Sequence, residues 1–137
     1  MSRKIREIRV VREQAEADFK GWVEAMDLSR GNSEEDSEDK ERIIKSIMYG
    51  DLIFNDDDEA EYTPWRKASK YRETIVFRER TGADLMAADS RNGKARGVVR
   101  QTYAMMGSLC GIEPSCFSKL SGSDIKTCEA IFTLLMG

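Results

Sequence analysis

The side chains that most often perform catalysis are scarce in this sequence, which contains three cysteines and no histidine. The lack of histidine excludes His-based general acid–base catalysis, Ser–His and Cys–His nucleophile pairs, and zinc sites that use histidine. Cys110, Cys116 and Cys128 are six and twelve residues apart, and neither spacing is the Cys-x-x-Cys of zinc or redox sites. All three lie on or beside apolar stretches, so we expect reduced thiols that pack as small hydrophobic groups in an intracellular protein.

Carboxylates are abundant, and some of them could in principle bind a cation or form a catalytic pair. The run Asp56–Glu61 lacks the central glycine and the alternating acids of a calcium-binding loop, so a solvated turn is the better interpretation. Asp84 and Asp89 are five residues apart, which does not place them on one helical face, and a helix start explains Asp84. The acids at 34–41 could contact a basic partner, but a solvated surface loop is the simpler explanation. The sequence therefore predicts no catalytic residue, no metal site and no cofactor.

A helix, a turn and a second helix between Gly111 and Phe132 have the arrangement of a helix–turn–helix motif, which reads the DNA major groove with its second helix. Base readout needs exposed Arg, Asn or Gln near the start of that helix, whereas this one offers Asp124, Lys126 and Thr127. Packing as a helical hairpin is the favoured interpretation. A small DNA-binding regulator is the alternative function.

Composition favours a soluble chain that binds neither nucleic acid nor membrane. The 137 residues include 22 Lys and Arg against 25 Asp and Glu, and residues 27–63 alone carry four basic and thirteen acidic residues. Because affinity for phosphate comes from Lys and Arg, a net acidic chain is a poor general DNA binder. No secretory h-region follows the charged N-terminus, and no apolar run approaches the ~18 residues of a membrane span. We expect one domain at residues 1–137.

The N-terminal region at 1–49 is predicted to be helical, with a long first helix at 2–26. The pairs Arg9–Glu13 and Arg12–Glu16 are spaced for i,i+4 contacts on its outer face. Its apolar stripe comprises Ile5, Ile8, Ala15, Phe19, Trp22 and Met26, with Val11 and Val23 beside it. This stripe needs a partner surface, either in the same chain or in a second copy of it.

Residues 29–41 contain no large apolar side chain and predict a mobile acidic loop. A short helix is expected to follow and to end at Gly50. Its buried stripe is predicted to comprise Ile43, Ile44, Ile47 and Met48.

Residues 50–80 predict an antiparallel β-meander. Leu52–Phe54, residues 62–65 and Thr74–Arg78 are β-prone, and the polar residues 55–59 suggest a hairpin between the first two. Pro64 indicates that the second strand is an edge strand or ends there.

Residues 81–137 predict a helical subdomain. A helix is expected from Thr81 to Asp89 with Leu85 and Met86 inward, followed by a helix at 94–110 that ends before Gly111. A short turn containing Phe117 precedes a final helix capped by Ser123. The expected fold is α+β, a small antiparallel meander with four to five helices, a long N-terminal helix and a helical C-terminal half.

Four segments in the C-terminal half carry a family resemblance. They are the strand and helix start Ile75–Asp89, the turn Leu109–Pro114, the helix start Leu120–Asp124, and the apolar helix that closes at Gly137. Over residues 74–137 this pattern resembles the tail assembly chaperones of long-tailed bacteriophages, especially Mu-like ones. Residues 1–50 depart from the short N-terminal β region that is usual in that family.

The resemblance implies a non-catalytic protein of the host cytoplasm that coats the tape-measure protein and helps to recruit tail-tube subunits. Apolar and methionine side chains suit the binding of a helical partner. The expected partner-binding residues are Trp22, Met26, Met105, Met106, Phe132, Leu135 and Met136. Homo-oligomerisation through the N-terminal helix is a further possibility, since Phe19, Trp22, Tyr62 and Trp65 could serve either as interface anchors or as core.

Overall fold

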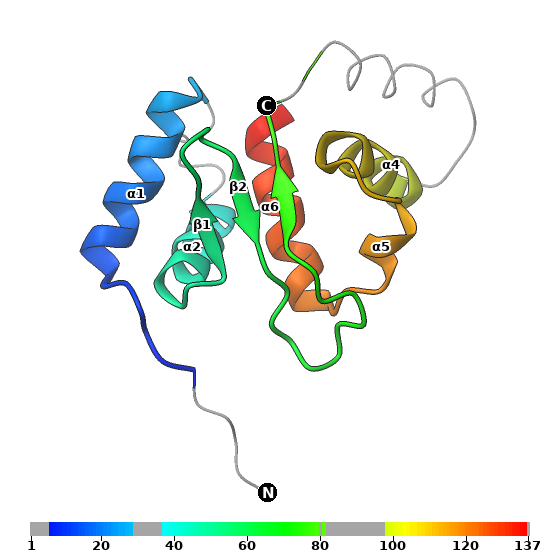
Figure 1. The fold of residues 1–137 in the computed structure, drawn as a ribbon, viewed down its shortest axis with the longest axis horizontal. Coiled ribbons are helices and arrows are strands. Elements are labelled where there is room, and N and C mark those ends of the chain that lie inside the picture. Colours follow the sequence, from blue (N-terminus) through cyan, green and yellow to red (C-terminus); the bar gives the residue numbers. More distant parts are fainter. Residues whose placement is uncertain (1–5, 29–36, 80, 82–97, 137) are drawn as a thin grey trace, which may run out of the picture.

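The structure is a computed structural model that describes residues 6–28, 37–79, 81 and 98–136 (Figure 1). Its helices are α1 (Arg12–Ala25), α2 (Ser37–Met48), α4 (Val98–Cys110), α5 (Ser115–Ser118) and α6 (Gly122–Met136). Its strands are β1 (Leu52–Phe54), β2 (Ala60–Tyr62) and β3 (Ile75–Phe77). These elements confirm the predicted α+β fold with a helical C-terminal half. The helix predicted at 81–89 lies, apart from Thr81, outside the described residues.

The three strands form the predicted antiparallel meander in the order β1-β2-β3. Leu52 lies opposite Tyr62, and Tyr62 lies opposite Ile75, so these three side chains share one face of the sheet and all are fully buried. Pro64 follows β2, which is the central strand. The alternative that Pro64 marks an edge strand is therefore wrong. The strand expected at residues 62–65 lies earlier, at Ala60–Tyr62, and ends two residues before Pro64.

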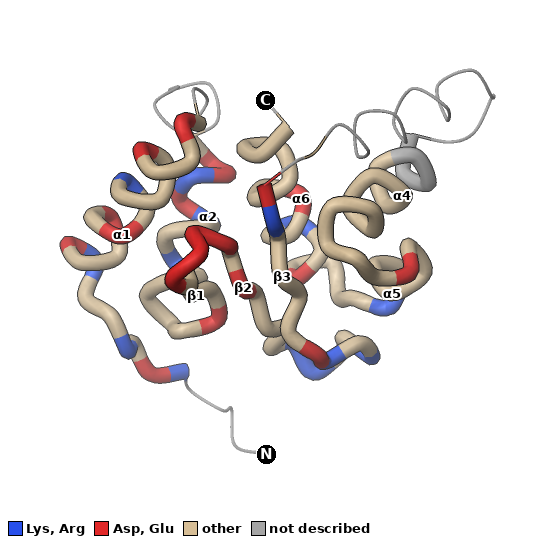
Figure 2. Tube along the Cα trace, turned by 45° about the horizontal axis from the view of Figure 1, so that its top comes forward, with Lys and Arg blue, Asp and Glu red and all other residues tan. Residues whose placement is uncertain are grey.

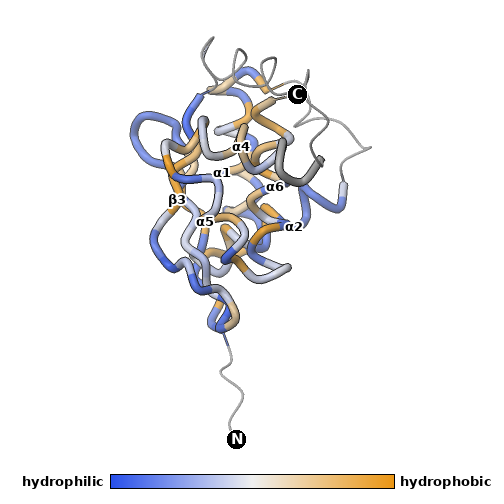
Figure 3. Tube along the Cα trace, turned by 90° about the vertical axis from the view of Figure 1, so that its right-hand side faces the viewer, coloured by the Kyte–Doolittle hydropathy of each residue, from blue (hydrophilic) through white to orange (hydrophobic). Residues whose placement is uncertain are grey.

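Two helices, α2 and α6, lie behind the sheet, while α1 flanks them on one side and α4 and α5 on the other (Figure 1). The side view separates the layers, with β3 at one edge and α6 and α2 behind it (Figure 3). α1 packs on α2, α2 packs on α6, and α4 packs on β3. Buried side chains from α1, α2, α4, α5, α6 and all three strands form one continuous hydrophobic cluster.

The first helix is shorter than its apolar pattern predicted, because it begins at Arg12 and not near residue 2. The preceding segment is extended, and the backbone amides of Arg9 and Val10 both donate to the carbonyl of Met48, at 2.8 and 3.0 Å. Ile8 and Val11 do not join the buried stripe and remain 57% and 68% exposed. β-branched residues favour such an extended backbone over a helix.

Charge pairing around the start of α1 follows from this shorter helix. Arg9 lies before the helix, so the predicted i,i+4 pair with Glu13 has no helical basis, whereas Nε of Arg12 donates to Glu16 at 2.9 Å. Arg12 also pairs with Glu41 of α2 and so links the two helices.

The predicted acidic loop at 29–41 is wrong at its C-terminal end, because α2 already begins at Ser37. Glu38 and Asp39 lie in the first turn of α2, where the positive end of the helix dipole stabilises acidic side chains. The helix dipole therefore favours a helix in a segment that was predicted to be a loop from its polarity alone. Residues 29–36 of that prediction lie outside the described residues.

The apolar stripe of α1 is used within the chain. Ala15, Phe19, Trp22 and Val23 are at most 3% exposed and belong to the shared core. Because these side chains are buried within one chain, they are not available for the homo-oligomerisation that was considered for the N-terminal helix.

Helix ends are set by glycine, arginine and serine. Gly50 and Gly111 have φ angles of 80° and 69°, in the left-handed region that glycine adopts without strain, as predicted for helix stops. Nε of Arg78 donates to the carbonyl of Leu109 at 3.0 Å and neutralises the negative end of α4. The predicted cap of the last helix is wrong by two residues, because Ser121 and not Ser123 accepts the backbone N–H of Asp124, at 3.2 Å.

Candidate functional site

Asp124 is a fully buried carboxylate at the start of α6. It accepts hydrogen bonds from the hydroxyl groups of Tyr62, Ser69 and Ser121 and from the backbone amides of Trp65 and Arg66. The amide of Arg66 lies 3.1 Å from Oδ2, and that of Trp65 lies 3.3 Å from Oδ1. Ser69 also accepts the backbone N–H of Ser121 at 2.8 Å. The network joins the connection between β2 and β3 to the first turn of α6.

This network is a structural centre, because its carboxylate is fully buried and its polar atoms are hydrogen-bonded to one another. In the sequence, Asp124 stands out only as part of a helix start and as a poor base-reading residue, neither of which reveals this role. A local signal was present, since Ser121 and Asp124 have the spacing of a capping box. The partners from residues 62–69 could not be found locally, because they lie more than fifty residues away in the sequence.

Burial and the hydrogen bond to Asp124 raise the pKa of Tyr62 well above its usual value. The unfolded chain releases this proton near pH 10, whereas the native state keeps it. Because the native state then binds more protons, rising pH favours unfolding, and the stabilisation present below pH 10 is lost above it.

We therefore expect the free energy of unfolding to fall with pH above about pH 10, and to fall less steeply in Tyr62→Phe. Urea denaturation between pH 8 and 11 measures both slopes. The variant should be less stable at pH 8, because it lacks the hydroxyl that donates to Asp124. Equal slopes in the two proteins would contradict the assignment.

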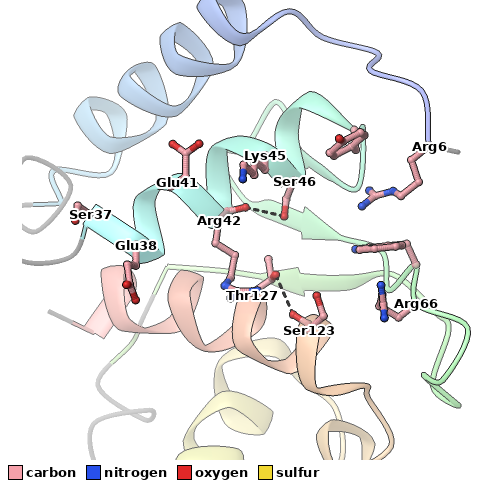
Figure 4. A pocket seen from close by; sticks show the side chains of 12 residues that line it. Arg6, Ser37, Glu38, Glu41, Arg42, Lys45, Ser46, Arg66, Ser123 and Thr127 are labelled. Carbon is pink, nitrogen blue, oxygen red and sulfur yellow. Dashed lines mark hydrogen bonds between the residues drawn. The ribbon is translucent and has the colours of Figure 1, made fainter.

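A groove of about 1010 Å³ lies between α2 and the first half of α6 (Figure 4). Arg42 and Lys45 of α2 line it, and Arg6 and Arg66 lie at one end. Ser123 and Thr127 provide its wall on α6. The groove is therefore polar and rich in cations.

Aromatic rings contact the arginine side chains at the cationic end of this groove. The guanidinium of Arg6 lies over Tyr49 and Trp65, 4.2 and 3.6 Å from the ring centroids, and it pairs with Asp51. Arg66 lies 5.0 Å from the centroid of Trp65. Burial lowers the pKa of Arg6, but a guanidinium stays charged at physiological pH. This end of the groove presents fixed positive charge.

The acidic run after β1 forms a turn, as predicted. Oδ1 of Asn55 accepts the backbone amides of Asp57 and Glu59 at 2.9 and 3.0 Å, and its Nδ2 donates to the carboxylates of Glu59 and Glu61. No group of three or more His, Cys, Asp or Glu among the described residues could hold a metal ion. Asp84 and Asp89 lie outside those residues.

The cysteines pack as small apolar groups. Cys128 is fully buried, Cys110 and Cys116 are partly buried, and no disulfide joins the three. Burial raises the pKa of the Cys128 thiol, which favours its neutral form.

The start of α6 is poorly placed to read DNA. Asp124 and Thr127 are 0% and 3% exposed, and Ser123 faces the groove beside α2. A recognition helix needs this end exposed to bases, and of the three residues considered for base contact only Lys126 is exposed. Within the described part of the chain, no helix is long and apolar enough to cross a membrane.

The seven predicted partner-binding residues divide into two groups. Four lie in the core, namely Trp22, Met106, Phe132 and Leu135, none more than 8% exposed. Three are partly buried against it, namely Met26, Met105 and Met136. The ends of α1 and α6 that carry Met26 and Met136 lie at the same edge of the molecule (Figure 1). The structure does not gather all seven on one surface.

In the residues described, the fold is α+β and combines a buried hydrogen-bond network with a groove lined by charged side chains. A family model of phage tail assembly chaperone proteins, described as "E, or 41 or 14", matches residues 63–137, more than half of the chain. The chain belongs to this phage tail assembly chaperone family, as the sequence resemblance indicated. No curated protein and no solved structure matches it.

Proposed function

We propose that the chain binds the tape-measure protein of its phage and recruits tail-tube subunits during assembly in the host cytoplasm. The observation that carries the proposal is the family match over residues 63–137, which span β3, α4, α5 and α6. Membership of this family supports a non-catalytic role in tail assembly. The identity of the two partners, the tape-measure protein and the tail-tube subunits, is what we propose beyond this family role.

Two methionines in the matched region are suited to contact a helical partner. Met105 of α4 and Met136 of α6 are partly buried, so each offers some thioether surface while resting on the core. Methionine adapts to irregular apolar surfaces because its side chain is unbranched and polarizable. In this proposal, the buried members of the predicted set act by holding α1, α4 and α6 in place.

The test is co-expression of the tagged chain with the tape-measure protein of the same phage. We expect wild-type protein to co-purify with it, and the double variant Met105→Gln/Met136→Gln to bind at least about tenfold more weakly. Burial of one methionine contributes about 1.5–3 kcal/mol, and 1.4 kcal/mol corresponds to a factor of ten.

Met48→Gln is the matched control, because Met48 is also a partly buried methionine but lies at the end of α2, outside the matched region. It should bind like wild type. If wild-type protein recovers no tape-measure protein, the proposed partner is wrong. If Met48→Gln weakens binding as much as the double variant, the proposed surface is wrong.

A further inference from the structure

The β1–β2 hairpin separates opposite charges at its two ends. Its closed end carries Asp56, Asp57 and Asp58, all exposed. At its open end, Tyr49 precedes β1 and Trp65 follows β2, and both belong to the cationic end of the groove. Figure 2 shows the acidic tip beside β1 and the basic stretch after β2 at the opposite side of the sheet. One short element therefore gives the molecule an acidic projection and a basic recess.

The basic recess is lined by more cations than acids, namely Arg6, Arg42, Lys45 and Arg66 against Glu38 and Glu41. Lys45 and Arg66 are exposed, and neither forms an ion pair with another described residue. Two acids, Glu38 and Glu41, also line the groove, but Glu41 is already paired with Arg12. The charge of the groove lining therefore favours binding of an anionic segment of polypeptide.

The acidic tip is pre-organised. The side chain of Asn55 fixes the turn through the backbone amides of Asp57 and Glu59, and Trp22 donates to the carbonyl of Asp58 at 2.8 Å. The Asp56 and Asp57 side chains make no hydrogen bond or ion pair with other described residues. A rigid tip loses little conformational freedom on docking.

We propose that the acidic hairpin tip of one copy docks in the basic groove of a second copy. Because tip and groove lie at opposite ends of the hairpin, the contact is head-to-tail, and a copy bound at one end keeps its other end open. Such a heterologous interface produces open chains unless the rotation between copies closes a ring. The groove volume of about 1010 Å³ is ample for a turn of four residues. The proposal concerns the chain alone and does not depend on the proposed tail partners.

The test measures the mass of the purified chain by sedimentation over a range of concentrations and salt. At low ionic strength we expect the weight-average mass to rise with concentration above the 15.6 kDa of the monomer, and to return to it in high salt. Asp56→Lys/Asp57→Lys and Lys45→Glu/Arg66→Glu should each remain monomeric. All four positions are exposed, so circular dichroism should show native spectra.

Mixing the two charge-reversed variants gives the sharpest result, because one retains an intact groove and the other an intact tip. The mixture should regain a mass above that of the monomer, because the intact acidic tip of one variant meets the intact basic groove of the other. Lys20→Glu/Lys119→Glu is the matched control, since it changes net charge equally at exposed positions outside this groove, and it should associate like wild type. A wild-type protein that stays monomeric at low salt overturns the proposal, and so does association that survives both charge reversals.

Discussion

Replacing Asp124 by alanine should lower the free energy of unfolding by about 3–5 kcal/mol, because five buried or partly buried donors lose their acceptor at once. Three of these donors belong to hydroxyl groups of Tyr62, Ser69 and Ser121, and two are backbone amides that cannot turn elsewhere. The total stability of a small protein is roughly 5–15 kcal/mol, so this loss is a large fraction of it. Chemical denaturation measures the difference directly.

Two further variants separate the network from simple loss of charge. Asp124→Asn keeps the shape of the side chain but replaces one accepting oxygen by an NH2 group that faces hydrogen-bond donors. We therefore expect this variant to remain strongly destabilised. Asp57→Asn removes an exposed acid that accepts no hydrogen bond through its side chain from the described residues, so it should leave stability nearly unchanged. If Asp124→Ala costs less than about 1 kcal/mol, comparable with one ordinary hydrogen bond, the network is not the structural centre described above.

Trp22→Ala should cost about 3–5 kcal/mol, as expected for removal of a buried aromatic ring. Trp22 is 3% exposed, stacks on Phe54 with a centroid separation of 4.8 Å, and donates its Nε1–H to the carbonyl of Asp58. It thereby attaches α1 to the β1–β2 hairpin. Thermal or urea denaturation should show the loss in the isolated protein, before any partner is added.

Trp22→Phe is the informative companion, because it keeps an aromatic ring in the core but removes the hydrogen bond to Asp58. We expect it to recover more than half of the stability that alanine loses. A Trp22→Ala variant that keeps wild-type stability but fails to bind partners would show that Trp22 is an interface anchor and not a core residue.

Local signals in the sequence were sufficient for much of the fold. Helical spacing of apolar residues and glycine stops located α2 and the end of α4, with Gly50 and Gly111 in the positive-φ positions that they were expected to occupy. β-branched and aromatic runs located β1 and β3, whereas the second strand was expected at residues 62–65 and lies at Ala60–Tyr62. Each of these features is decided within a few residues of the chain.

Features decided by distant residues were predicted less well. Periodicity extended the first helix to residue 2, but the amides of Arg9 and Val10 bond to the carbonyl of Met48 instead. Polarity alone predicted a loop at 37–41, where helix-dipole and ion-pair effects favour α2. Four of the five donors to Asp124 lie at residues 62–69, more than fifty residues away, and no local pattern points to them.

The predicted partner-binding residues show a different limit of sequence reasoning. Apolar side chains at helical spacing have the same pattern whether they face the core or a partner. Trp22 and Met106 were selected by that pattern and lie in the core, whereas Met105 and Met136 retain exposed surface. Only the packing of the helices separates the two groups.

In the proposed function, the chain acts by binding tail proteins of its phage. The most direct measurement is an affinity purification of the tagged chain from phage-producing cells, with bound proteins identified by mass spectrometry. We expect recovery of the tape-measure protein, with tail-tube subunits in smaller amounts. A stable, folded bait that recovers neither protein from cells in which both are made would contradict it.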